Sequence, residues 1–141
     1  MVSTAGYSGT PLGRKLGLRD GMRIRLLSPP EHYWSLFGPE VDAEALEVLS
    51  PRSRSEAEFT HLFAVRPGDL RKGLARARKG MTVDGMVWVS WPKGSSSMES
   101  DIGRAEVMAE GKAAGLVDVK VCAVDEDWSG LKFVIPLEDR G

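Results

Sequence analysis

The sequence contains very little cysteine and histidine. Its 141 residues include one cysteine, Cys122, and two histidines, His32 and His61. A single cysteine cannot form an intramolecular disulfide, and Cys122 lies in an apolar run where a small buried side chain is expected. No Cys, His, Asp and Glu cluster with metal-ligand spacing surrounds either histidine. The sequence therefore predicts neither a disulfide nor a metal site, and His61 is expected to be a hydrogen-bonded core residue.

Long hydrophobic runs and an excess of positive charge are also absent. No apolar stretch approaches the roughly 20 residues needed to span a bilayer, and no apolar leader is visible near the first residue. The net charge is -1, which gives no electrostatic reason to expect nucleic-acid binding. The basic segment 69–80 is interpreted as the solvated surface of an amphipathic helix. We therefore expect a cytoplasmic protein with no membrane and no nucleic acid among its partners.

The composition is that of a folded domain, with 42% hydrophobic and 28% charged residues. Residues 1–141 are expected to form a single domain, with residues 1–20 as a helical lead-in that includes a short helix between Pro11 and Gly17. Residue patterns predict further helices at 31–37, 69–80 and about 102–113, and strands at 23–27, 45–49, 59–65, 87–91, 117–124 and 131–137. Turns at Asp20-Gly21 and Asp84-Gly85 are expected to precede two of these strands.

The order of these elements is typical of an α/β sheet. Strands that alternate with helices predict a mostly parallel sheet, and the turn 125–130 between the last two strands predicts an antiparallel C-terminal hairpin. Trp128 lies in that turn and is expected either to pack over the edge of the core or to meet a partner.

Two resemblances follow from particular segments. The turn 83–86 before a strand that ends in Ser90, and Ala114-Gly-Leu-Val117 before the hairpin, resemble the second half of the class I (Rossmann-like) methyltransferase fold. Segments 5–12, 88–93 and 116–132 resemble a bacterial family without an established activity, the domain-of-unknown-function 3052 family. The resemblance implies a three-layer, six-stranded sheet of order 2-1-3-4-6-5, with one strand–helix unit missing between the second strand and Phe59.

A candidate ligand crevice follows from this topology. Ligands of such sheets bind beyond the carboxyl ends of the strands, where the winding direction reverses. In this sequence that position lies at the ends of the first and third strands, and the loop after the fourth strand lies beside it. The candidate ligand-binding residues are Ser28, Pro29, Glu31, His32, Ser90, Trp91, Lys93 and Trp128.

The cofactor of the methyltransferase fold, S-adenosylmethionine, is disfavoured. Its binding needs a glycine-rich turn after the first strand, because side chains there would block the cofactor. This sequence has Ser28-Pro29-Pro30-Glu31 instead, and Ser50-Pro51-Arg52 stands where an acid would bind the ribose hydroxyls. We therefore expect no cofactor and no catalytic residue.

The sequence favours a non-catalytic Rossmann-like binding or regulatory protein for a small molecule or a protein partner. One alternative is a divergent S-adenosylmethionine-dependent methyltransferase that uses His32 or Glu31. Another alternative is a protein-interaction module that uses the edge of the terminal hairpin or the basic helix.

Overall fold

One six-stranded sheet of order β2-β1-β3-β4-β6-β5 forms the centre of the protein. The structure is a computed structural model and describes residues 11–140. Strands β1 to β4 are parallel, and β6 runs antiparallel to both β4 and β5. The predicted strand order and the antiparallel hairpin are therefore confirmed. The strands are β1 Arg23–Leu27, β2 Glu47–Val48, β3 Ala57–Phe63, β4 Met81–Pro92, β5 Val117–Ala123 and β6 Trp128–Val134.

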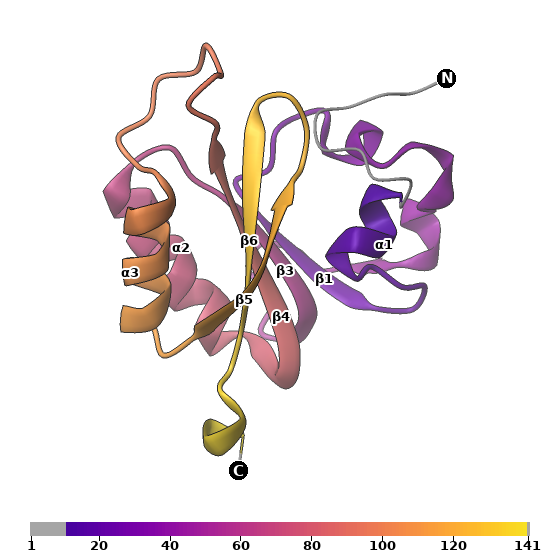
Figure 1. Cartoon of the computed structure of the whole chain (residues 1–141). Helices are drawn as coiled ribbons and strands as arrows, with labels where there is room; N and C mark the ends of the chain where they lie inside the picture. The colour runs from indigo at the N-terminus through magenta and orange to yellow at the C-terminus, as the bar shows by residue number, and fades with distance from the viewer. Residues whose placement is uncertain (1–10, 141) are drawn as a thin grey trace.

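Helices cover both faces of the sheet. The helices α2 (Pro67–Lys79) and α3 (Arg104–Ala113) pack on one face, and α1 (Leu12–Leu16) packs on the other (Figure 1). Short 3-10 helices at Tyr33–Leu36, Gly38–Glu40 and Ala43–Ala45 lie with α1, and a fourth, at Leu137–Asp139, follows the hairpin. Within residues 11–140, no helix is long and apolar enough to cross a membrane.

Each face of the sheet has its own hydrophobic core. Leu70, Leu74 and Ala77 of α2 are buried at the spacing that the sequence predicted, and they pack in the core beneath α2 and α3. In α3, Gly111 lies directly against the ring of Phe133 on β6, and a Cβ atom there would collide with that ring. The missing side chain therefore lets α3 approach the sheet closely.

Three local predictions differ from the structure. Asp84-Gly85 does not form a turn: β4 runs through it as one strand, and the register shift between Ala57 and Phe59 of β3 lies beside it. The strand expected at 45–49 is reduced to the two residues Glu47–Val48, and its first expected residue belongs to the 3-10 helix Ala43–Ala45. The helix expected at 31–37 is a single 3-10 turn after the prolines. Residues 1–10 of the predicted helical lead-in lie outside the described residues.

No helix connects β2 to β3. Residues 49–56 link these parallel strands directly, and no third helix lies next to α2 over β1 (Figure 1). This agrees with the predicted loss of one strand–helix unit. The face of β1 toward α2 is therefore covered mainly by a loop.

The close approach at Gly111 gives a first prediction. Gly111→Ala should lower the free energy of unfolding by about 1–3 kcal/mol, because the added methyl group overpacks the α3–β6 contact. Gly68→Ala is the matched control, since Gly68 lies in the first turn of α2 with open space around it. Urea unfolding of both variants measures the difference. Equal stabilities for the two variants would contradict the close contact.

Candidate functional site

The corner after β1 is a sharp turn with an unusual backbone. Ser28 has a φ of 54°, which is rare for a residue other than glycine. Ser28 and Pro29 are exposed, and the carbonyl of Pro30 accepts a hydrogen bond from the amide of Tyr33. The chain therefore passes from β1 into the 3-10 helix η1 (Tyr33–Leu36) without a glycine-rich loop.

Aromatic rings fill the space beside this corner on the α1 face. Tyr33 is 2% exposed and packs edge-to-face with His61 and Phe63, at ring-centroid distances of 5.4 and 5.7 Å. Phe63 in turn packs edge-to-face with Trp128 at 5.0 Å. Trp128 is buried in the core beneath α1, and Trp91 is buried in the core beneath α2 and α3. On the α1 side, therefore, the predicted crevice is packed with side chains.

Three buried side chains, from η1, β3 and β4, are joined by hydrogen bonds next to these rings. The Tyr33 hydroxyl lies 3.0 Å from Nδ1 of His61, and Nε2 of His61 lies 2.8 Å from Oγ of Ser90. His61 and Ser90 are fully buried, so the predicted role of His61 in the core is confirmed. Burial lowers the pKa of His61 to about 3 and raises that of Tyr33 above its ordinary range. The histidine is therefore neutral and excluded from solvent, which suits a structural role.

The loops at the rim of the sheet are bonded to one another. His32 lies 3.7 Å from Asp125 of the hairpin turn, and its side chain is 55% exposed. The amide of Lys93 donates to the carbonyl of Asp127, and the Ser96 hydroxyl donates to the Asp127 carboxylate. Glu31 is exposed nearby in sequence. The structure thus brings His32 to the hairpin but does not gather the predicted site residues into one cavity. In the described part of the chain, no group of three or more Cys, His, Asp and Glu side chains could hold a metal ion.

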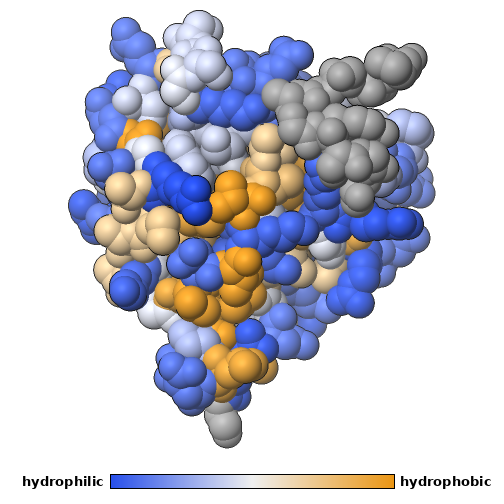
Figure 2. All heavy atoms as spheres, viewed as in Figure 1, coloured by the Kyte–Doolittle hydropathy of each residue, from blue (hydrophilic) through white to orange (hydrophobic). Residues whose placement is uncertain are grey.

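The edge strand β5 bears on the interaction-module hypothesis. Val117, Val119 and Val121 are exposed, and hydrophobic atoms appear among polar ones on the face in front of the hairpin (Figure 2). A register shift between Asp118 and Lys120 interrupts the pairing of β5 with β6. Such an irregularity shortens the regular edge that another strand could extend.

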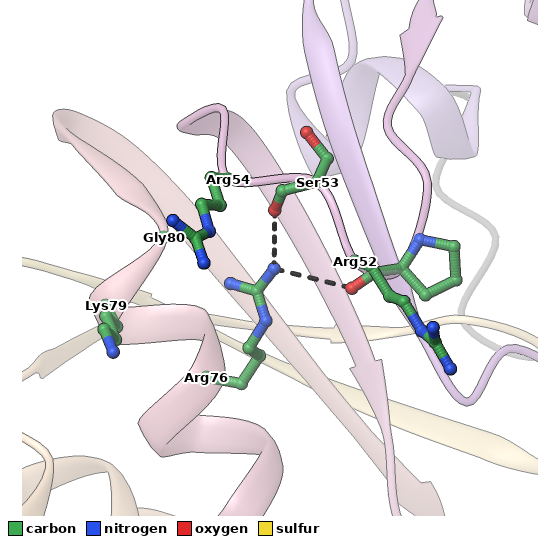
Figure 3. Close-up of a pocket in the computed structure, with 7 residues that line it drawn as sticks. Arg52, Ser53, Arg54, Arg76, Lys79 and Gly80 are labelled. Carbon is green, nitrogen blue, oxygen red and sulfur yellow. Dashed lines mark hydrogen bonds between the residues drawn. The ribbon is translucent and has the colours of Figure 1, made fainter.

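A basic pocket lies on the α2 side of the sheet, between α2 and the segment that links β2 to β3. Its volume is about 740 Å³. A second hollow, of about 420 Å³, shares Pro51 and Arg76 with it and reaches Ser28 and Pro29. The two hollows lie where a helix between β2 and β3 would otherwise cover the sheet. The residues that line the basic pocket are Pro51, Arg52, Ser53, Arg54, Arg76, Lys79 and Gly80 (Figure 3).

Two guanidinium groups hold the linking segment in place: Arg76 lines the basic pocket, and Arg25 lies buried next to it. Arg76 donates to the carbonyl oxygen of Ser53 at 2.8 Å (Figure 3). Arg25, which is fully buried on β1, donates to the same oxygen at 3.0 Å, to the carbonyl of Ser55 at 2.6 Å and to that of Gly80 at 2.8 Å. Burial, and then the charge of Arg76, lower the pKa of Arg25. The loop is thus fixed to the sheet and to α2 by arginine–carbonyl bonds.

No carboxylate neutralises this pocket. Among residues 11–140, the ion pairs are His32–Asp125, Arg66–Asp101 and Arg71–Glu110. The arginines and the lysine of the pocket take part in none of them. None of the site residues predicted from the sequence lines this pocket, since the pattern of 69–80 indicates a solvated helix and 50–52 indicates only the loss of an acid. The sequence feature that could have indicated the pocket is the pair Arg52 and Arg54, in a segment between two strands that contains no helix pattern.

Several solved structures are similar to this protein in fold. A TehB-like S-adenosylmethionine-dependent methyltransferase from Corynebacterium glutamicum is 10% identical, with a TM-score of 0.57 over 94% of this chain and 91% of that chain. Fibrillarin from Aeropyrum pernix, with natively bound S-adenosyl-L-methionine, is 14% identical, with a TM-score of 0.57 over 87% and 73%. The calicheamicin-biosynthesis methyltransferase CalO1 is 16% identical, with a TM-score of 0.58 over 89% of this chain and 52% of its own. The fold is therefore that of the class I methyltransferases.

The chain belongs to the family described as "Protein of unknown function (DUF3052)", whose sequence model matches residues 62–137. No curated protein sequence matches it. The matched region begins in β3 and includes α2, so the family match covers only part of the basic pocket.

The buried histidine gives a second prediction, on pH dependence. Folded His61 stays neutral to about pH 3, whereas an unfolded histidine binds a proton near pH 6.5. The unfolded state therefore binds more protons below pH 6.5, and His61 should reduce stability by up to about 1.4 kcal/mol per pH unit as the pH falls.

Urea unfolding between pH 7 and pH 4.5 measures this slope. His61→Gln, which keeps hydrogen-bonding groups but does not titrate there, should flatten the slope. His32→Gln is the control and should keep the wild-type slope, because His32 is exposed and lies outside the buried chain. An unchanged slope in His61→Gln would show that His61 is not held neutral.

Proposed function

We propose that this protein is a non-catalytic Rossmann-like binding protein that does not use S-adenosylmethionine. The observation that carries the proposal is the corner Ser28–Glu31 together with the rings packed beside it. A cofactor in this fold would lie against the main chain after β1. Two prolines stand there, and neither has an amide hydrogen to donate.

The packing on the α1 side supports the same conclusion. Tyr33, Phe63 and Trp128 pack against one another edge-to-face next to the corner, and all three are nearly fully buried. An adenosine group at this position would have to displace large aromatic side chains from the core. Each buries a large apolar area, so displacing them would be costly.

The runner-up is a divergent methyltransferase, which the pair of exposed His32 and half-buried Asp125 supports. A histidine at the rim with a carboxylate 3.7 Å away could accept a proton from a substrate. However, this pair lies outside the buried chain of Tyr33, His61 and Ser90. The alternative therefore offers a base without a recognisable place for the methyl donor.

Titration with the cofactor tests this proposal. S-adenosylmethionine and its demethylated product, each at 1 mM, should leave the melting temperature unchanged; a ligand at 100 times its dissociation constant would add about 2.7 kcal/mol. A known S-adenosylmethionine-binding protein measured in parallel confirms that the compounds are intact. A saturable rise in melting temperature with either compound would overturn the proposal. If His32→Ala then abolished methyl transfer but kept the rise, the methyltransferase alternative would be supported.

A further inference from the structure

The basic pocket contains positive charge that the protein leaves unneutralised. Arg52, Arg54, Arg76 and Lys79 line it, and Arg25 lies buried directly behind Gly80. None of these five side chains forms an ion pair within the described residues. Like charges gathered in this way repel one another, and an anion between them would relieve the repulsion.

Helix stabilisation explains only part of this charge. Arg76 and Lys79 lie in the last turn of α2, where cations interact favourably with the helix dipole. Arg25 comes from the middle of β1, and Arg52 and Arg54 come from the linking segment. The three arginines outside the helix therefore need another explanation.

The buried side chain of Arg25 also indicates positive charge that the protein does not neutralise. Its side chain is 0% exposed, and Nε is a buried donor without a hydrogen-bond partner in the described structure. Thr60, its register partner on β3, likewise has a buried hydroxyl without a partner. A buried cation is normally paired with a carboxylate, because desolvation of an unpaired charge is costly. In the described structure, the guanidinium group of Arg25 has only backbone carbonyls as hydrogen-bond partners.

Two backbone positions, Ser53 and Gly80, contact the guanidinium groups of both Arg25 and Arg76. Arg25 and Arg76 donate to one shared oxygen, that of Ser53. Both groups also lie against Gly80, where a Cβ atom would be 2.5 Å from Nη1 of Arg25 and 2.6 Å from Nη1 of Arg76. Any residue other than glycine would push them apart. Gly80 has a φ of -107°, so close approach rather than backbone conformation is what requires glycine there.

We propose that this pocket binds a small ligand that carries a phosphoanhydride or two neighbouring phosphate groups. A guanidinium group presents paired donors that match phosphate oxygens, and Arg54 and Arg76 supply two such groups. Figure 3 shows Arg54 and Lys79 on the Gly80 side of Arg76, with Arg52 on the other side. The side chains of Arg52, Arg54 and Lys79 donate no hydrogen bond within the described structure, so these side-chain donors are available to a ligand.

The size and surroundings of the pocket fit such a ligand. A volume of about 740 Å³ exceeds the needs of a single phosphate ion and lies within the range of small-molecule sites. The adjoining hollow presents Leu26, Leu27 and Leu62, and it provides an apolar surface for the organic part of the ligand. Asp69 and Lys72, also in that hollow, can orient polar groups.

The charge distribution favours a small ligand over nucleic acid. The cations converge on one hollow, and the chain as a whole has a net charge of -1. Nucleic-acid binding would instead need a basic surface along which several phosphates lie. On α2, Arg71 is paired with Glu110 of α3, so part of the charge outside the pocket is already neutralised.

Calorimetric titration with sodium pyrophosphate tests this proposal. At 150 mM salt, which screens long-range attraction, the full-length chain should bind pyrophosphate at one saturable site. Arg54→Gln and Lys79→Gln should each weaken binding about tenfold or more, since each removes a charge-assisted hydrogen bond. Arg104→Gln is the matched control: it removes the same charge from an exposed position on α3 and should leave the affinity unchanged. Circular dichroism confirms that each variant is folded.

Three results would overturn the proposal. The first is absence of saturable binding up to 10 mM pyrophosphate, and the second is an equal loss of affinity in Arg104→Gln and Arg54→Gln. The third is tighter binding of a 20-nucleotide DNA than of pyrophosphate, with equal losses in Arg54→Gln and Arg71→Gln, which would indicate a nucleic-acid surface.

This inference goes beyond the proposed function, because the pocket lies on the opposite face of the sheet from the aromatic rings. Binding of S-adenosylmethionine that Arg54→Gln leaves unchanged would overturn the proposed function alone. Failure of pyrophosphate to bind would overturn the anion site alone.

Discussion

The bonds from Arg25 and Arg76 to the carbonyl of Ser53 hold together the part of the fold that differs most from a complete Rossmann-like sheet. A central strand such as β1 normally has both faces covered by helices. Here the connection from β2 to β3 contains no helix, and a loop must cover the α2 face of β1. A loop contributes little apolar area, so hydrogen bonds from two arginines to its carbonyls fix it in place. One of these arginines is buried as a result, which leaves its charge without a carboxylate.

The two faces of β1 are therefore covered in different ways. On the α1 face, the diproline corner leads into η1, and Tyr33 and Phe37 fill the space next to the strand ends with aromatic area. On the α2 face, hydrogen-bonded arginines cover the strand but leave a hollow beside it. The α1 face beside the corner is thus filled with side chains, and the open volume lies on the α2 face, where the connection from β2 to β3 contains no helix.

Much of the fold could be predicted from the sequence, because its signals are local and agree with one another. The spacing of Leu70, Leu74 and Ala77 marks the buried side of α2, and Gly17, with a φ of 91°, ends α1 as glycine at a helix end predicts. The strand order came from a resemblance rather than from periodicity. The Asp84-Gly85 prediction was wrong because these residues lie within β4, in the irregular part of the strand opposite the register shift between Ala57 and Phe59 of β3, and a β-bulge can hold a turn-like dipeptide without ending the strand.

The candidate site was harder to predict, because it depends on contacts between distant segments. Ser28 follows β1 directly, and His32 lies 3.7 Å from Asp125 of the hairpin turn. Trp128 is buried against Phe63, as one of its two predicted roles requires, but no local pattern predicts that Arg25 on β1 meets Arg76 on α2. Arg25 lies in β1 next to Ile24 and Leu26, and a charged side chain in such a strand is expected to face solvent. It is buried only because residues 53–55, which are about 30 positions further along the chain, supply carbonyl oxygens on that face. An ordered loop and a buried charge thus depend on each other, and a ligand that neutralised the charge would also favour the ordered loop, since binding to the folded state alone shifts the equilibrium toward it.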